Sequence, residues 1–240
     1  MDNWCERTEL MFGSSDLEKL KSANILIVGV GGVGASAAEM LVRAGVGNIT
    51  IVDADKVSLS NCNRQLVALH STVGKSKVDV LAERLSDINP ELKINKIEAF
   101  IKDEFTVELL ADNNFSFIVD AIDTLAPKVF LLAEAVKRGI PVVSSMGSGG
   151  KLNPAMVKID DISKSDYCKL ARMVRKRLHR LGIRKGITVV YSAEVVPPER
   201  IIETGGEQHK KSNVGTVSYM PAIFGCYIAS YVIRYLTNNL

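Results

Sequence analysis

Residues 24–34 read Asn-Ile-Leu-Ile-Val-Gly-Val-Gly-Gly-Val-Gly, an apolar strand that runs directly into a glycine-rich turn. Because glycine has no Cβ, Gly29 and Gly31 allow a tight turn and the close approach of a pyrophosphate, while Gly34 lets the next helix pack closely on the sheet. That helix, expected over residues 32–44, points its free amides and its positive dipole end toward an anion. The stretch therefore predicts an α/β sheet that binds a nucleotide.

A second apolar segment, residues 49–53, ends in Asp53, about 20 residues beyond the glycines, where a carboxylate can bind ribose hydroxyls. The glycine turn alone does not distinguish a dinucleotide from ATP. Two cations follow, Arg64 on a polar loop and Lys77 at the start of the next expected helix. Both could lie over the phosphates and would suit an enzyme that cleaves a phosphoanhydride and neutralises the developing negative charge.

Strand and helix patterns alternate as far as residue 145, which predicts a doubly wound, mostly parallel sheet. The carboxyl ends of its strands should bring together Gly29, Asp53, Asp123 and the loop 147–150, and ligands bind at such an edge. The further expected elements are helices over 74–87, 104–111 and up to 138, strands over 92–99, 115–120, 141–145 and 188–192, and a closing helix over 221–236.

The chain has 240 residues, of which 47% are hydrophobic, and one domain is the simplest interpretation. Within it we expect a nucleotide-binding half, residues 1–150, and a substrate-facing half, residues 151–240, that adds antiparallel strands. The net charge is +3, but residues 169–185 hold eight Lys or Arg and no acid. An amphipathic basic helix here would be either a solvated helix face or a surface for nucleic acid, and charge alone leaves both open.

Other classes of protein fit the composition poorly. The amino terminus has no charged start followed by an apolar run, and the apolar stretches 25–42 and 220–233 are interrupted or too short to span a membrane, so we expect a cytoplasmic protein without a membrane segment. The four cysteines form no Cys-x-x-Cys pair, which disfavours a zinc site or a redox dithiol.

Five motifs occur in a fixed order: Gly-x-Gly-Gly-x-Gly at 29–34, Asp-x-Asp-x-Val at 53–57, Asn-x-Asn-Arg-Gln at 61–65, Gly-x-x-Lys at 74–77 and Asp-x-x-Asp at 120–123. In order and spacing they resemble the ubiquitin-activating-like adenylyltransferases, which include the ThiF, MoeB and HesA proteins. Further motifs, from Arg7-Thr-Glu-Leu to Gly-Thr-Val-Ser-Tyr-x-Pro at 215–221, make the chain most similar to the tRNA threonylcarbamoyladenosine dehydratases. The resemblance implies a Rossmann-like sheet of the activating-enzyme type and a homodimer.

The resemblance also implies the chemistry. ATP would activate the threonyl carboxylate of threonylcarbamoyladenosine in tRNA as an acyl-adenylate, and the carbamoyl group would then close a ring with net loss of water. Arg64, Lys77, Asp123 and Arg7 would be catalytic, with Asp123 binding Mg²⁺ and Arg7 reaching the γ-phosphate within its own chain or across the dimer. The expected nucleotide contacts are Gly29, Gly31, Gly32, Gly34, Asp53, Asp55, Asn61, Arg64, Gln65, Lys77 and Asp123. The expected tRNA contacts are Arg172, Arg175, Lys176, Arg177 and Arg180.

Three alternatives stay open at this point. The first is an adenylyltransferase that activates the C-terminus of a small sulfur-carrier protein, although such enzymes carry two Cys-x-x-Cys pairs that are missing here. The second is a nicotinamide-dependent oxidoreductase, for which residues 29–53 alone would suffice. The third is a non-catalytic module that binds nucleotide and RNA. The sequence also leaves open whether a sulfur-transfer protein is a partner.

Overall fold

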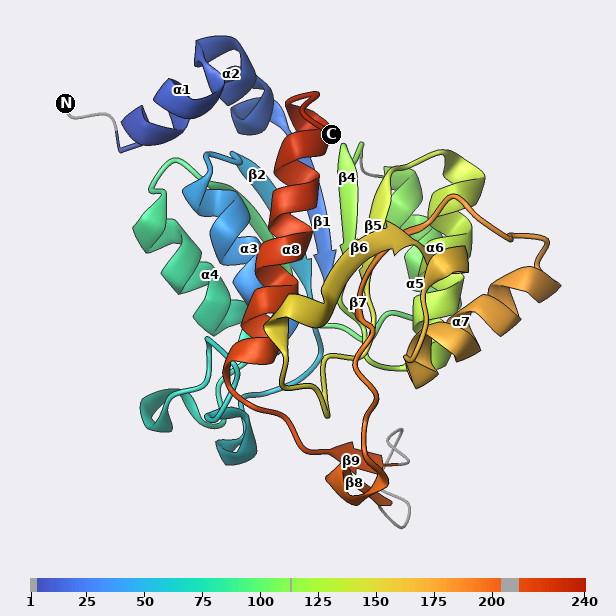
Figure 1. Ribbon diagram of the computed structural model, residues 1–240. Helices are drawn as coiled ribbons and strands as arrows, with labels where there is room; N and C mark the ends of the chain where they lie inside the picture. The colour runs from blue at the N-terminus through green and yellow to red at the C-terminus, as the bar shows by residue number, and fades with distance from the viewer. Residues whose placement is uncertain (1–3, 113, 204–211) are drawn as a thin grey trace.

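The computed structural model describes residues 4–112, 114–203 and 212–240, and a seven-stranded sheet forms its centre (Figure 1). The strand order is β3-β2-β1-β4-β5-β7-β6, with β6 antiparallel to β7 and all other neighbours parallel. The strands are β1 (Asn24–Val28), β2 (Asn48–Val52), β3 (Lys93–Ile97), β4 (Phe117–Asp120), β5 (Val142–Ser145), β6 (Val157–Asp161) and β7 (Thr188–Ser192). The expected doubly wound sheet with an antiparallel addition is confirmed, and β1 and β4 flank the point where the strand order reverses, the usual ligand crevice.

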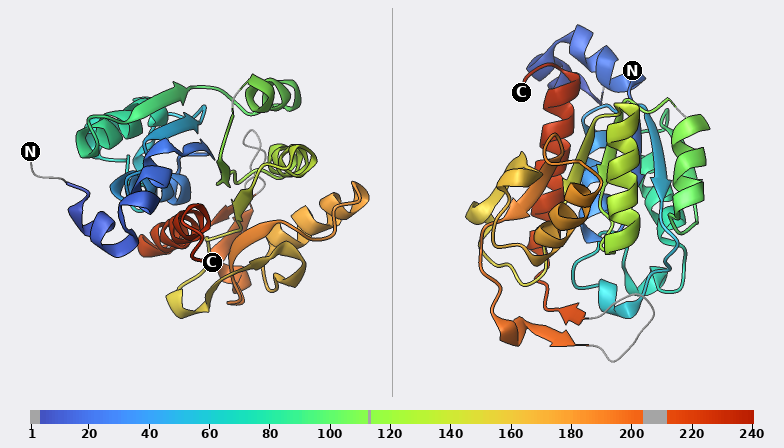
Figure 2. Two further views of the ribbon diagram at one scale, coloured as in Figure 1. Left: turned by 90° about the horizontal axis from the view of Figure 1, so that it is seen from above. Right: turned by 90° about the vertical axis from the view of Figure 1, so that its right-hand side faces the viewer.

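Helices cover both faces of the sheet (Figure 2). One layer contains α3 (Gly32–Arg43), α4 (Lys77–Ile88) and α8 (Tyr219–Leu236), and the other contains α5 (Asp103–Asp112), α6 (Leu125–Arg138) and α7 (Lys169–Arg180). Alternate residues of β1 pack against the two layers. Ile25 and Ile27 lie in the hydrophobic cluster under α3, α4 and α8, and Leu26 and Val28 lie in the cluster under α5, α6 and α7. Because both faces are buried, the central strands are apolar throughout rather than alternating.

Two additions lie at opposite ends of the sheet (Figure 1). Helices α1 (Glu6–Phe12) and α2 (Ser14–Ser22) lie at the amino ends of the strands, while a separate hairpin of β8 (Ile201–Glu203) and β9 (Ser212–Val214) lies beyond the carboxyl ends. Neither addition was predicted from the sequence. Helix α1 buries no side chain and so shows no apolar period, and each hairpin strand has only three residues.

In the described part of the chain, no helix combines the length and apolarity needed to cross a lipid bilayer.

Candidate nucleotide site

The glycine turn after β1 lies against the end of β4. Gly29 has φ +87°, a conformation that side chains disfavour, and a Cβ there would lie 2.8 Å from the carbonyl oxygen of Ala121. A Cβ on Gly34 would lie 1.8 Å from the carbonyl oxygen of Gly29, so α3 could not begin where it does. These two contacts require glycine for the reasons predicted: a tight turn and close packing of the helix on the sheet.

Asp53 directly follows β2, and its carboxylate accepts a hydrogen bond from the backbone of the glycine turn. Its Oδ2 accepts the N–H of Val30 and its Oδ1 accepts the N–H of Asp55, both at 2.8 Å. Burial raises the pKa of Asp53, while the charge of Lys77 and these two amides act in the opposite direction. The carboxylate therefore fixes the turn where a phosphate chain would approach, in addition to any ribose contact.

Lys77 is the first residue of α4 and is buried, with its Nζ 2.7 Å from Oδ2 of Asp55. Its backbone N–H donates to the carbonyl of Asp55 as well. An ammonium has three donor hydrogens, so the ion pair orients Lys77 and leaves donors for a ligand. The predicted cation is thus held in one position at the carboxyl edge of the sheet.

The segment 61–65 borders the same turn. Asn61 is buried and its Oδ1 accepts the N–H of Ser58, so it stabilises its own loop. Arg64 donates from Nη1 to the Ser60 carbonyl and to Oδ1 of Asn63, and a Cβ on Gly32 would lie 3.0 Å from the Arg64 carbonyl oxygen. These bonds place the guanidinium beside the turn.

Gln65 has a buried acceptor at the glycine turn without a partner in the described part of the chain. Its Nε2 lies 3.7 Å from the position a Cβ would take on Gly31, and its Oε1 is buried with no hydrogen-bond partner among the described residues. A buried acceptor without a donor is unusual and is commonly satisfied by water or a ligand. A hydroxyl-bearing ligand at the glycine turn would satisfy it, which fits a nucleotide.

A buried ion pair holds the loop that carries Asp123. Asp120 and Lys128 are both fully buried, with their charged atoms 2.8 Å apart, and Ser144 donates to the same carboxylate oxygen at 2.6 Å. The other oxygen of Asp120 accepts the N–H of Ile122, and Lys128 donates to the Ile122 carbonyl at 2.9 Å. The loop is therefore fixed between β4 and α6, with Asp123 exposed at its tip.

No role was predicted for Lys128, although a lysine near the start of an otherwise apolar helix could have been noticed in the sequence.

For Mg²⁺, the described residues contain no group of three His, Cys, Asp or Glu side chains able to bind a metal. A metal at Asp123 would thus need oxygen ligands from another molecule, which suits Mg²⁺ because it commonly binds one or two carboxylates and the phosphates of its substrate.

A second buried lysine, Lys151, connects three segments of the C-terminal part of the chain, which was predicted to face the substrate. Lys151 follows the loop 147–150, is 2% exposed, and donates to the carbonyls of Tyr167, Ser192 and Glu194. Burial lowers its pKa because the ammonium loses water. Lys151 was not predicted; it joins the end of β5, the end of β7 and the segment before α7.

Glu194 and Arg200 extend this junction to the hairpin. The carboxylate of Glu194 accepts the N–H groups of Leu152 and Asn153 at 2.8 Å; burial opposes its ionisation, but these amides with Lys151 and Arg200 lower its pKa. Arg200 donates to the carbonyl of Gly150 at 2.8 Å and lies 3.6 Å from Glu194. The hairpin is thereby attached to the loop at the carboxyl end of β5.

Helix α7 presents most of the predicted RNA-binding cations. It buries Ala171, Val174 and Leu178 and exposes the opposite faces. The exposed cations of the five predicted are Arg172, Lys176, Arg177 and Arg180. The fifth, Arg175, is half-buried and donates to the carbonyls of Ile162 and Ser165 and to the Ser165 hydroxyl, so it faces that loop, and its contact with tRNA stays a prediction.

Helix α1, which contains Arg7, lies at the other end of the sheet from the glycine turn (Figure 1). The helix is anchored by Cys5, whose Sγ is 3.5 Å from the Cβ position of Gly45, just before the amino end of β2. A strand of five residues spans about 16 Å, which exceeds the reach of an arginine side chain. Arg7 therefore cannot contact a phosphate bound by its own chain.

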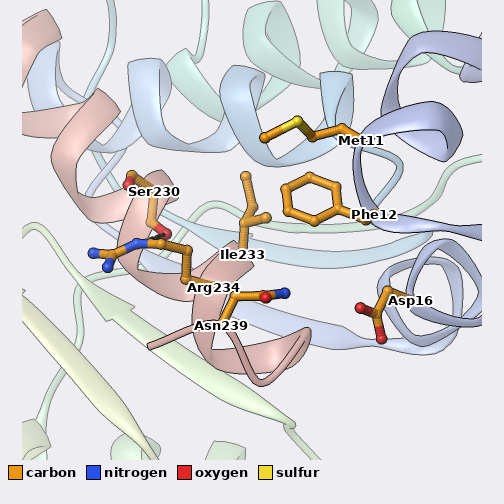
Figure 3. A pocket seen from close by; sticks show the side chains of 7 residues that line it. All are labelled: Met11, Phe12, Asp16, Ser230, Ile233, Arg234 and Asn239. Atoms are coloured by element: carbon orange, nitrogen blue, oxygen red, sulfur yellow. Dashed lines mark hydrogen bonds between the residues drawn. The ribbon is translucent and has the colours of Figure 1, made fainter.

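A pocket of about 430 Å³ also lies at this amino end, between α1, α2 and α8 (Figure 3). Its lining mixes apolar groups with Asp16 and Arg234 and includes no residue predicted to bind nucleotide. The candidate site is therefore the turn and loops at the carboxyl edge, and this pocket is separate from it.

Comparison with known proteins places this arrangement in a family. The model of the ThiF family matches residues 6–239, and the chain belongs to that family. Within it, the chain is 39% identical to the tRNA threonylcarbamoyladenosine dehydratase of Bacillus subtilis, over 98% of this chain and 94% of that protein. The crystal structure of the Escherichia coli tRNA N6-threonylcarbamoyladenosine dehydratase in complex with ATP has a TM-score of 0.88 and 32% identity, covering 97% of this chain and 93% of that one.

A molybdopterin-synthase adenylyltransferase from Escherichia coli is also 39% identical, but only over 53% of this chain and 50% of that protein.

Proposed function

We propose that this protein is an ATP-dependent tRNA threonylcarbamoyladenosine dehydratase. One observation carries the proposal: the similarity to dehydratases extends over 98% of the chain, whereas the similarity to the adenylyltransferase covers 53%. The remainder of a dehydratase must recognise a nucleoside in tRNA rather than a carrier protein. The exposed cations of α7 suit that task, because phosphate contacts supply much of the affinity for nucleic acids.

The nucleotide would lie in the crevice outside β1 and β4. Its phosphates would meet the amides of the glycine turn and the amino end of α3, with Lys77 and Arg64 beside them. Fixed cations stabilise the negative charge that develops as pyrophosphate leaves, without a cost of reorganisation in the transition state. Asp55 and Asp53 orient Lys77 and the turn, while Gln65 would accept a hydrogen bond from the ligand.

The reaction then needs two steps. An oxygen of the threonyl carboxylate attacks the α-phosphorus of ATP, forming an acyl-adenylate and releasing pyrophosphate. A nucleophilic atom of the neighbouring carbamoyl group attacks the activated carbonyl carbon, loses a proton and expels AMP, so the nucleoside loses one water overall. Because both reacting groups belong to one nucleoside, proximity accelerates the ring closure.

We further propose that Asp123 binds Mg²⁺, which would neutralise the phosphates, and that a homodimer brings Arg7 to the second subunit's nucleotide. The dimer is supported by the placement of Arg7 at the amino end of its own sheet, and Leu10 and Met11 on α1 are exposed apolar side chains available for an interface. A cytoplasmic location follows from the tRNA substrate.

The test is mass spectrometry of nucleosides from tRNA that carries threonylcarbamoyladenosine, after incubation with the protein, Mg²⁺ and ATP. We expect loss of one water from that nucleoside only when ATP is present. Lys77→Ala should abolish the change, whereas Lys75→Ala should not, because Lys75 is an exposed lysine on the same loop. Thermal unfolding of both variants confirms that each is folded.

An intact nucleoside with the unaltered protein, together with tight ATP binding, would refute the proposal. Pyrophosphate exchange that depends on a small carrier protein would then favour the adenylyltransferase, which the half-length similarity makes the second candidate.

A further inference from the structure

Tyr167 has an unusual combination of exposure and constraint. Its side chain is 66% exposed, yet its backbone is in the left-handed region with φ +47°. Residues other than glycine, asparagine and aspartate seldom adopt this conformation, and such residues gather where a site needs a fixed geometry. Because the ring is exposed, it buries little apolar surface and contributes little stability that would offset the strain of its backbone.

The surrounding structure fixes this backbone at the carboxyl edge of the sheet. The carbonyl of Tyr167 accepts a hydrogen bond from the buried Nζ of Lys151 at 3.4 Å. The next residue, Cys168, is buried, with its Sγ 3.7 Å from the Cβ position of Gly147. The ring therefore projects from a segment tied to the loop 147–150, on the same edge as the glycine turn and Asp123.

Charge around Tyr167 indicates what it would contact. Cys168 caps the amino end of α7, so Tyr167 directly precedes the helix whose exposed cations begin with Lys169 and Arg172. One exposed acid, Asp166, directly precedes Tyr167, but none occurs between Lys169 and Lys185. An exposed aromatic ring beside a row of cations is the usual combination for single-stranded nucleic acid, in which cations bind phosphates and rings stack on bases.

We propose that Tyr167 is a stacking platform for an unpaired base of the RNA substrate. The proposal rests on the proposed function, since it concerns how the same site holds tRNA. For its threonylcarbamoyl group to reach the bound ATP, the modified nucleoside must leave the base stack of the RNA. This exposes a face of its own base or of the neighbouring base. Tyr167, fixed between α7 and the loop 147–150, is placed to cover such a face while the cations of α7 follow the backbone.

The test measures affinity for two RNAs: a stem-loop with threonylcarbamoyladenosine in its loop, and a duplex of similar charge without unpaired bases. Tyr167→Asn removes the ring but tolerates the left-handed backbone. We expect it to weaken binding of the stem-loop by roughly 5- to 100-fold and to leave binding of the duplex unchanged. The salt dependence should also stay the same, because no charge is removed.

Two further variants separate stacking from a general effect. Tyr167→Phe keeps the ring and should bind the stem-loop as the unaltered protein does. Leu181→Asn removes another exposed apolar side chain, at the other end of α7, and should change nothing.

Each other outcome has a distinct meaning. Equal affinity of Tyr167→Asn and the unaltered protein for the stem-loop would overturn the stacking role, while the proposed function would stand. Equal weakening for stem-loop and duplex would also overturn it, because stacking cannot act on paired bases. If the unaltered protein bound neither RNA, the proposed function would fail and this inference with it.

Discussion

The two halves of the carboxyl edge present positive charge in opposite ways. Beside β1, β2 and β4, two lysines are buried and paired: Lys77 with Asp55, and Lys128 with Asp120. On α7, beyond β7 and β6, four exposed arginines and lysines make no ion pair with any described residue; they are Arg172, Lys176, Arg177 and Arg180. The charge of the two buried lysines is thus fixed in place, whereas that of the four cations on α7 is left in solvent.

The difference follows from what each half would bind. Transition-state stabilisation needs a charge at one place, and a buried ion pair provides it at the cost of desolvation. Binding of a nucleic acid backbone needs charge over an area, with geometry that adapts to the helix. Substitutions in the first half should therefore change stability or turnover, and substitutions in the second should change affinity and its salt dependence.

The largest effect is expected from Lys128→Met. This change leaves the Asp120 carboxylate buried with Ser144 and one amide but no counter-charge. We expect the free energy of unfolding, measured by urea denaturation, to fall by about 3–5 kcal/mol.

The double variant Lys128→Met, Asp120→Asn removes both charges and provides the control. It should recover part of the loss, because the buried charge is gone. A loss below about 1 kcal/mol in Lys128→Met would show that the pair does not hold this loop.

The parts of the site that lie in short sequence motifs could be predicted, whereas contacts made by tertiary packing could not. Gly29, Asp53 and Lys77 each belong to a short motif, and the order and spacing of these motifs predicted the turn, the carboxylate and the cation. Lys128 meets Asp120 and Ser144 only through the packing of α6 on β4 and β5, which spacing does not reveal. The half-buried position of Arg175 was not predicted either, because composition counts cations and does not say which face of α7 each one occupies.

Asp123→Asn tests an exposed charge in the same half as the buried Lys77 and Lys128. Asp123 is exposed at the tip of the loop, so a neutral side chain should leave stability within about 0.5 kcal/mol. If it binds Mg²⁺, turnover should fall by about 100-fold, a loss similar to that of one transition-state contact. Steady-state rates over a range of Mg²⁺ concentrations measure this, and unchanged rates would remove Asp123 from the catalytic groups.

The second half is tested by a pair of variants on one helix. Arg177→Gln with Arg180→Gln should weaken tRNA binding by about 10-fold and flatten its dependence on salt by about one unit per lost phosphate contact, with stability and ATP affinity unchanged. Arg175→Gln is the matched control: it should lower stability by about 1–3 kcal/mol, because its carbonyl partners lose a charged donor, and leave the salt dependence as it was. The opposite pattern would place Arg175 at the RNA surface and break the distinction between buried and exposed cations.

The smallest effect is expected from Lys151, a buried cation in the second half, and it concerns how stability depends on pH. Because burial lowers its pKa, the folded chain binds fewer protons than the unfolded chain between that lowered value and 10.5, and Lys151 makes stability rise with pH across this window. The rise cannot exceed about 1.4 kcal/mol per pH unit for one group. Lys151→Met should remove this rise from a series of urea denaturations between neutral pH and about pH 10. If the Lys151→Met series were instead parallel to that of the unaltered protein, the ammonium of Lys151 would be as well solvated in the folded chain as in the unfolded one, and the buried cations Lys77 and Lys128 would have no counterpart beside α7.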